Sequence, residues 1–323
     1  MRELKIGTND AGQRLDKFIT KALDLPMGLL YKSIRTKKIK VNRKRAENNT
    51  ILQVGDVVQC FLAEEFFKDG AQGCELGSIT PRLDIVYEDE NILLLNKAPG
   101  ISVHEDEHTQ KNTLITHIQA YLYQQGQYNP EDELSFAPAL CNRIDKNTGG
   151  IVIAAKNAEA LRIMNEKIKL RELDKRYLAA LHGIPEPHSA TLRAYLVKDE
   201  KENIVRVYDK NPPRGAKEIL TKYTVVATSG GNALVEVELL TGRTHQIRAH
   251  MAHIGHPLIG DGKYGINASD RKKGYKYQAL YSYKLTFKFS GEPTALDYLS
   301  GKTFSIDKRN IYFTDEFFGK HDN

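Results

Sequence analysis

The sequence predicts an α+β protein, with a small, basic α/β unit followed by a larger body built on a mixed, largely antiparallel sheet. The first observation behind this prediction is a series of short apolar runs in the second half, without helical patterns between them. They lie at residues 176–181, 204–207, 220–227 and 233–240. The second is a change in charge and composition after residue 62. We therefore expect a unit at 1–62, a linker at 63–81 and a body at 82–323.

The positive charge of the chain is concentrated in the first unit. The whole sequence has 47 Lys or Arg and 41 Asp or Glu, a net charge of +6. Residues 1–62 hold 13 of these basic residues and 6 of the acidic ones, a balance of +7, which leaves 34 against 35, or −1, for residues 63–323. A basic module of this kind favours contact with a polyanion, and a solvated charged face is the alternative.

Membrane and disulfide-rich classes do not fit the composition. The segment after Met1 lacks the apolar core of a signal peptide, and no apolar run approaches the ~18 residues that cross a bilayer. The three cysteines, Cys60, Cys74 and Cys141, have no C-x-x-C spacing, so we expect reduced thiols. These features predict a cytoplasmic protein.

Two helices and several strands are expected in the first unit. The first helix, at residues 14–23, carries four apolar side chains on one face: Leu15, Phe18, Ile19 and Ala22. A second short helix is expected at 27–35. Strands are then expected around 39–41 and 54–61, with a basic loop at 42–45 between them.

This order of elements is similar to that of S4 RNA-binding domains, over about residues 12–62. The shared features are Arg14-Leu-Asp16, a basic second helix, a Val41-Asn42 turn and Gly55-Asp-x-Val58 near the end. S4 modules bind structured RNA mainly through its shape and phosphates. The resemblance therefore implies seven candidates for contacts with the RNA backbone: Lys32, Arg35, Lys37, Lys38, Arg43, Lys44 and Arg45.

The remaining elements are expected from shorter patterns. The linker contains several glycines without a clear period, and Phe66 and Phe67 are candidates to pack it onto either neighbour. In the body, two strands are expected within 84–97 and two helices at 113–123 and 157–173. A polar loop is expected at 124–138.

Asp145 is the first candidate for chemistry. It lies just before a Thr148-Gly-Gly150 turn and a β-branched strand at 151–153. Rigid backbone and the nearby charge of Arg143 would hold this carboxylate ionised, as a nucleophile or base requires. The alternative is an aspartate favoured by the turn and merely charge-balanced by its neighbour. These residues alone leave both interpretations open.

Two later segments also contain candidate functional side chains. Tyr177 lies on the strand predicted at 176–181, where an aromatic ring is more often part of the core than a platform for a ligand. Residues 239–251 are richer in polar side chains than a helix needs for solubility. Five of them are candidates for a site: Arg243, His245, Gln246, Arg248 and His250.

The histidines raise a metal hydrolase as an alternative function. His245, His250, His253 and His256 lie within twelve residues, and a helix would bring some of them onto one face. However, the sequence has no H-E-x-x-H pattern, and Asp261 is the one convincing carboxylate partner. We favour histidines that cap or cross a helix, and expect no bound metal.

Taken together, four motifs occur in the order and approximate spacing of the RluA-type pseudouridine synthases. They are Asn96–His104, Arg143–Gly150, Lys175–Gly183 and Thr241–Met251, and the resemblance extends through Gly255–Gly265 to cover about residues 82–290. Three motifs depart from the family pattern. Asn142-Arg-Ile-Asp replaces His-Arg-Leu-Asp, Thr148-Gly-Gly replaces Thr-Ser-Gly, and Lys97-Ala-Pro-Gly replaces Lys-Pro-x-Gly. None of these changes removes the aspartate, the tyrosine or the arginines.

The resemblance implies the pseudouridine synthase fold and the isomerisation of uridine to pseudouridine. No cofactor is expected, because the uracil leaves its sugar and rejoins it through C5 without a redox step or an external donor. Asp145 would be the catalytic carboxylate, Arg243 the arginine that pairs with it, and Tyr177 the ring that stacks on the target base. Arg143 would fill the space that the flipped base leaves.

The implied partner is structured RNA, with large-subunit ribosomal RNA as the main expectation and transfer RNA as the alternative. No membrane partner is expected, and we expect the chain to act as a monomer. A non-catalytic S4-type RNA-binding protein is the remaining alternative. Such a protein is expected to lack one of Asp145, Tyr177 and Arg243, and all three are present.

Overall fold

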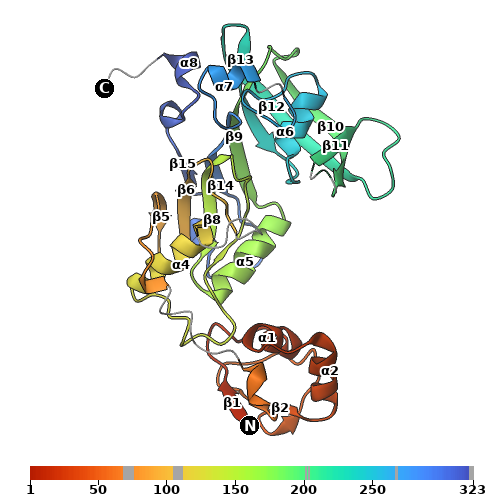
Figure 1. Cartoon of the computed structure of the whole chain (residues 1–323), viewed down its shortest axis with the longest axis vertical. Helices are drawn as coiled ribbons and strands as arrows, with labels where there is room; N and C mark the ends of the chain where they lie inside the picture. The colour runs from red at the N-terminus through yellow and green to blue at the C-terminus, as the bar shows by residue number, and fades with distance from the viewer. Residues whose placement is uncertain (68–75, 105–111, 201, 203, 266–267, 320–323) are drawn as a thin grey trace.

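The computed structural model describes residues 1–67, 76–104, 112–200, 202, 204–265 and 268–319. Two separate sheets organise these residues, one in the N-terminal part and one in the body. The N-terminal part lies at one end of the long axis of the molecule, next to α5 (Ala158–Lys169) (Figure 1). Within the described residues, no helix is both long and apolar enough to cross a bilayer.

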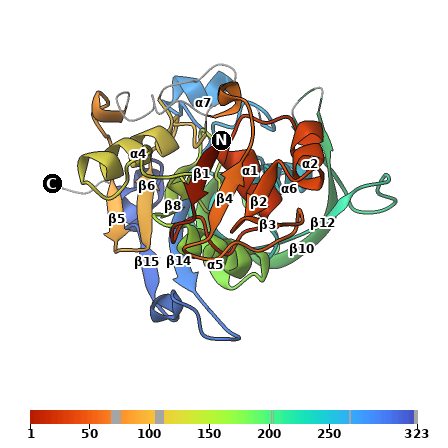
Figure 2. The ribbon, with the colours of Figure 1, turned by 90° about the horizontal axis from the view of Figure 1, so that it is seen from below.

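The N-terminal sheet has four strands, in the order β1-β4-β2-β3. The strands are β1 (Arg2–Lys5), β2 (Ile39–Val41), β3 (Lys44–Arg45) and β4 (Val57–Cys60). Helices α1 (Leu15–Ala22) and α2 (Met27–Arg35) pack beside them, and Figure 2 shows this arrangement from below. Leu15, Phe18 and Ile19 are buried in the core of this part, which confirms the predicted apolar face of the first helix.

The beginning of the linker packs onto the N-terminal part rather than onto the body. The backbone N–H of Asp24 donates to the carbonyl of Phe66 at 3.0 Å, and Phe67 is buried in the N-terminal core. The guanidinium of Arg2 lies over the Phe67 ring, 4.7 Å from its centroid. Phe66 and Phe67 therefore extend the N-terminal unit beyond residue 62.

The body is built on one large sheet. Its longest path runs β11-β10-β12-β13-β9-β14-β8-β6-β5, with β15 paired to β14 and β7 paired to β8. The bounds are β5 (Ile85–Glu88), β6 (Ile92–Lys97), β7 (Ala139–Leu140), β8 (Gly149–Ala155), β9 (Leu173–Leu181), β10 (Ser189–Asp199), β11 (Ile204–Tyr208), β12 (Lys217–Ser229), β13 (Asn232–Leu239), β14 (Leu280–Phe287) and β15 (Thr303–Ser305). β8 and β14 pair in parallel and the other pairs described are antiparallel, so the predicted mixed, largely antiparallel sheet is confirmed.

β14 joins the two halves of this sheet. Ser282 on β14 is in register with Tyr177 on β9 and with Gly150 on β8. The glycine pair before the apolar run of β8 explains how the strands come so close. A β-carbon on Gly149 would lie 2.4 Å from the Tyr281 ring, and one on Gly150 would lie 2.2 Å from the Ser282 carbonyl oxygen. The sequence therefore needs glycine at both positions.

The longer helices of the body have capped beginnings. Helix α4 (Leu114–Gln124) and helix α5 begin after Thr113 and Asn157, whose side chains accept from backbone N–H groups of the first turn. The remaining helices are α6 (Gln246–His253), α7 (Ala268–Lys272) and α8 (Asp315–Phe318). The prediction that α5 continues to residue 173 was wrong. The helix ends at Lys169 because Arg171 is left-handed, with φ of 63°, and β9 already begins at Leu173.

Polar contacts connect the N-terminal part to the body. The Asn9 side chain donates to Glu133 at 2.6 Å and accepts from the backbone N–H of Ala158 at 3.1 Å, at the start of α5. Arg162, on the same helix, donates to the carbonyl of Ala11 at 3.1 Å. The loop between β1 and α1 is thus held against the N-terminal half of α5.

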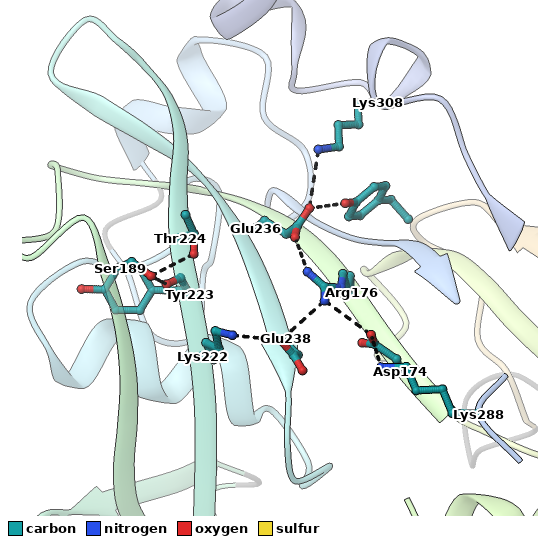
Figure 3. Close-up of polar contacts among 11 residues, drawn as sticks. Asp174, Arg176, Ser189, Lys222, Tyr223, Thr224, Glu236, Glu238, Lys288 and Lys308 are labelled. Carbon is teal, nitrogen blue, oxygen red and sulfur yellow. Dashed lines mark hydrogen bonds and ion pairs between the residues drawn. The ribbon is translucent and has the colours of Figure 1, made fainter. Parts of the chain in front are cut away.

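A network of charged side chains braces β9 on one face of the sheet (Figure 3). Arg176 donates to Glu236 on β13 at 2.7 Å, and Glu236 also accepts from Tyr283 on β14. Lys308 lies 3.5 Å from Glu236. Because side chains alternate along a strand, Tyr177 faces the other side of the sheet. The network therefore fixes the strand that carries Tyr177 without occupying its face.

Candidate active site

Asp145 lies in the loop between β7 and β8, where a backbone turn holds it. The Thr148 N–H donates to the Asp145 carbonyl at 3.0 Å, and β8 begins directly afterwards. The Asp145 side chain is 25% exposed, so it can be reached from outside. This placement fits the predicted sequence of aspartate, turn and buried strand.

The partner of the Asp145 carboxylate is Arg248, on α6. Nη1 of Arg248 donates to Oδ2 of Asp145 at 2.8 Å. The other side of the same guanidinium forms a bidentate pair with Asp261, with Nε and Nη2 at 2.7 and 2.8 Å from its two oxygens. Arg248 is thus held in a single orientation by one carboxylate while it contacts the other.

The charges of this buried pair stabilise each other. Burial disfavours the charged form of Arg248, but its bonds to Asp261 and its proximity to Asp145 outweigh this and raise its pKa above the ordinary value. Burial would likewise raise the pKa of Asp261, but Arg248 and the backbone N–H groups of Lys263 and Tyr264 lower it below the ordinary value. Both groups are therefore ionised at neutral pH.

The expectation that Arg243 pairs with Asp145 was wrong. Arg243 is exposed and precedes α6, and its backbone N–H donates to the Gln246 side chain at 3.1 Å. Because the helix begins at Gln246, Arg248 falls in its first turn and points into the body, whereas Arg243 does not.

Arg143 is also exposed, and no ion pair between it and Asp145 is recorded in the part of the chain that the structure describes. The Arg143 side chain is therefore available for other contacts.

Tyr177 lies on β9, with 6% of its surface exposed. Burial raises its pKa to about 12; a hydrogen bond with Ser282 opposes this shift, and the charge of Asp145 adds to it. The phenol is therefore neutral at physiological pH, and it lies close enough to Asp145 to sense its charge. Tyr177 is part of the core and a neighbour of the carboxylate at once.

Lys97, which was not among the predicted site residues, holds the Asp145 loop from behind. Its Nζ donates to the carbonyls of Ala98, Ile101 and Lys146 at 2.9 to 3.0 Å. The side chain is 1% exposed, and burial lowers the pKa of Lys97 to about 7, with Asp145 acting in the opposite direction. Only its place in the Asn96–His104 motif could have indicated a role.

A second polar network fixes the start of α6. Gln246 accepts from the Thr241 hydroxyl at 2.9 Å and donates to the Thr221 hydroxyl at 3.0 Å. Thr221 also contacts Nδ1 of His250 at 2.9 Å. Burial, with a smaller effect of His253, lowers the pKa of His250 to about 4, so the imidazole is neutral. Gln246 and His250 thus position the helix rather than contact a ligand.

The four histidines that suggested a metal site make separate contacts. His253 lies 2.9 Å from Asp209, His256 contacts the His182 carbonyl at 3.0 Å, and His245 contacts the Tyr264 hydroxyl at 2.8 Å. No group of three or more potential metal ligands is found among the described residues. Of the described cysteines, Cys60 and Cys141 are free, and Cys74 lies outside the described residues.

The seven basic candidates of the N-terminal part are all exposed. Lys32, Arg35 and Arg45 line one groove of about 780 Å³, together with Arg14 and Tyr31. Lys37, Lys38, Arg43 and Lys44 lie on the surface outside the residues that line this groove. The structure thus brings three of the seven candidates together.

Comparison with known proteins identifies the family to which the chain belongs. The model of the family described as RNA pseudouridylate synthase matches residues 91–253, which include Asp145, Tyr177 and Arg248. The chain is 34% identical over 282 residues to an uncharacterized RNA pseudouridine synthase of Mycoplasma genitalium, covering 85% of each chain. It is 30% identical over 296 residues to the ribosomal large subunit pseudouridine synthase C of Escherichia coli, covering 88% of this chain and 87% of the relative.

Solved structures share the fold. Human RNA pseudouridylate synthase domain containing 4 superimposes with a TM-score of 0.54 at 21% identity, over 69% of this chain and 87% of its own. Human RNA pseudouridylate synthase domain containing 1 superimposes with a TM-score of 0.53 at 23% identity, over 71% of this chain and 94% of its own.

Fold and sequence together define an RNA-modifying isomerase. The chain belongs to the RNA pseudouridine synthase family, in its RluA branch. This excludes the metal hydrolase alternative.

Proposed function

We propose that this enzyme isomerises uridines in large-subunit ribosomal RNA, with Asp145 as the catalytic carboxylate and without a cofactor. The observation that carries the proposal is the fixed pair of Asp145 and Arg248 beside Tyr177. Relatives whose names refer to the ribosomal large subunit support the choice of RNA. Transfer RNA is the alternative substrate.

The reaction balances without an outside reagent. The N1–C1′ bond breaks, the uracil turns, and a bond forms between C5 and C1′; C5 loses its proton and N1 gains one. Asp145 either attacks the sugar or the ring, or takes a proton from the sugar. Arg248 donates a hydrogen bond to this carboxylate and so orients it for each of these roles.

Tyr177 is proposed to stack on the target base, and its neutral phenol suits that contact. The base must first leave its helix, at a cost of a few kcal/mol. Arg143, exposed and two residues from Asp145, is proposed to fill the space that the base leaves. We propose that Arg243, which is also exposed, contacts RNA phosphates.

The proposed substrate can be tested by incubating the purified full chain with protein-free large-subunit ribosomal RNA and, separately, with bulk transfer RNA. The protein is dialysed against EDTA beforehand. We expect new pseudouridines in the ribosomal RNA, located by carbodiimide labelling and primer extension, at the same rate with and without the dialysis. Modification of transfer RNA alone would contradict the choice of RNA. A rate that falls after EDTA and returns with zinc would contradict the reaction without a cofactor.

We also propose that the N-terminal part is an S4-like RNA-binding module. Its groove joins three basic side chains to an exposed tyrosine, a combination suited to phosphates and unpaired bases. Lys37, Lys38, Arg43 and Lys44 are proposed to extend the same basic surface toward the RNA backbone.

Replacing Lys32, Arg35 and Arg45 by Ala is expected to weaken binding to structured RNA and to reduce its dependence on salt. Each lost phosphate contact lowers the steepness of log K against log salt by ~0.7 to 0.9, so the slope of the triple variant is expected to be shallower by ~2.1 to 2.7. Fluorescence anisotropy across a salt series measures this slope. The matched control replaces Lys169, Lys198 and Lys302, which are exposed on the body, and removes the same charge. Equal slopes for the two triple variants would contradict a role of the groove.

A further inference from the structure

His245 has an uncommon, left-handed backbone conformation. It directly precedes α6, with φ of 54° and ψ of 17°, in the left-handed region. Glycine adopts this region freely, and asparagine, aspartate and histidine adopt it more often than other residues do.

Nδ1 of the His245 imidazole faces a hydroxyl that already accepts a hydrogen bond. The Tyr264 hydroxyl oxygen accepts from the backbone N–H of Val205 at 2.9 Å and lies 2.8 Å from Nδ1 of His245. These are its hydrogen-bond partners among the described residues. Because Val205 already occupies one acceptor position of the hydroxyl, the hydroxyl is suited to donate its proton to Nδ1, and a neutral ring then carries its own proton on Nε2. Burial, opposed in part by Asp145, lowers the pKa of His245 and so favours the neutral ring.

The other ring nitrogen, Nε2, faces the proposed catalytic carboxylate. Nε2 of His245 lies 3.8 Å from Oδ2 of Asp145, the same oxygen that accepts from Arg248. Tyr264 supports both neighbours: its ring packs edge-to-face on His245, with centroids 5.6 Å apart, and lies 5.3 Å from the Arg248 guanidinium carbon. Two donors thus converge on Oδ2, and no hydrogen bond to Oδ1 is recorded within the described part of the chain.

We propose that His245 is a positioning residue for Asp145. With its tautomer set by Tyr264 and Val205, its Nε2–H acts with Arg248 on Oδ2, so that Oδ1 is the oxygen that reacts with the substrate. At 3.8 Å the N–H dipole stabilises the charge on Oδ2, and a shift of about 1 Å makes a full hydrogen bond. This inference rests on the proposed role of Asp145.

The tautomer can be observed directly in the full chain labelled with ¹⁵N-histidine. A long-range ¹H–¹⁵N NMR spectrum at neutral pH distinguishes a protonated Nε2 from a protonated Nδ1, and His245→Asn identifies the signal. We expect His245 to carry its proton on Nε2, and Tyr264→Phe to shift the ring toward a mixture of tautomers. A proton on Nδ1 in the wild-type protein would overturn the proposal. The NMR measurement of the tautomer does not depend on isomerisation, so it tests the role of His245 independently of the proposed function.

The effect on the reaction is tested with His245→Asn, which suits the left-handed backbone and should fold normally. We expect an unchanged or higher melting temperature, unchanged RNA affinity, and a single-turnover rate lowered roughly 10-fold to 100-fold, the scale of one lost hydrogen bond to a charged group. Tyr264→Phe is expected to lower the rate less, and to add little to His245→Asn because both act through one ring.

Tyr298→Phe is the matched control, because it removes a tyrosine hydroxyl that bonds to Asp89 at 2.6 Å, away from α6. It is expected to leave the rate unchanged. A wild-type rate for His245→Asn, or fully additive losses in the double variant, would show that the ring does not act on Asp145. If Asp145→Asn itself remains active, the proposed catalytic role of Asp145 fails instead, whatever the tautomer of His245.

Discussion

Replacing Asp145 by Asn is expected to abolish pseudouridine formation while the protein stays folded and binds RNA. Asparagine keeps the shape of the side chain but lacks the charge and the nucleophilicity, so we expect the single-turnover rate to fall roughly 10⁴-fold or more. The stability loss should be small, about 1 kcal/mol, because Arg248 keeps its bidentate pair with Asp261.

The experiment compares single-turnover isomerisation, RNA affinity and thermal melting on the same preparation. Asp209→Asn is the matched control: this aspartate is exposed and contacts His253 away from Asp145. It should behave as wild type in all three measurements. A folded Asp145→Asn protein that isomerises uridine at a near wild-type rate would remove Asp145 from the mechanism, and an unfolded one would make it a structural residue.

Replacing Arg248 by Met is expected to cause the largest loss of stability, together with a loss of activity. The variant leaves Asp261, which has no exposed surface, without its charged partner. Breaking a buried ion pair from one side costs about 3 to 5 kcal/mol. The loss of activity has a separate cause, because Asp145 loses its hydrogen bond from Nη1.

Two further variants separate these effects in urea unfolding and single-turnover assays. Arg248→Met combined with Asp261→Asn removes the stranded charge, so it should regain part of the stability but none of the activity. Arg243→Met removes an exposed arginine of the same motif and should change stability by less than about 0.5 kcal/mol. If Arg248→Met proved as stable and active as wild type while Arg243→Met was inactive, the original assignment of Arg243 would be right after all.

The contrast between Arg243 and Arg248 shows where sequence reasoning reached its limit. The polar motif at 241–251 was recognised, but the choice between two arginines five residues apart depends on where α6 begins. That start is set by the left-handed His245 and by the Gln246 network, neither of which follows from periodicity. In the same way, α5 was extended too far because the left-handed Arg171 has no signature in an apolar pattern.

Local patterns were sufficient where an element depends on its own residues. The helices α1 and α2 and the glycine pair at the start of β8 were all predicted, since an amphipathic face or a tight turn depends on residues close together in the sequence. β1, β10 and β14 were not predicted. β1 is short and mostly charged, so its strand structure depends on its partner β4. The alternating residues of β10 and β14 do fit a strand, and these two pair with β12 and β9. Lys97 was missed for a related reason, because its burial depends on the carbonyl of Lys146.

The central position of β14 has a consequence for the order in which the protein becomes active during its synthesis. Asp145 and Tyr177 are brought together only when residues 280–287 insert between β8 and β9, late in the chain. The N-terminal sheet, by contrast, is complete by Cys60, so its contacts can form soon after that residue leaves the ribosome. With the RNA-binding role proposed for the N-terminal part, a nascent chain could bind RNA before residues 280–287 complete the sheet that holds Asp145 and Tyr177.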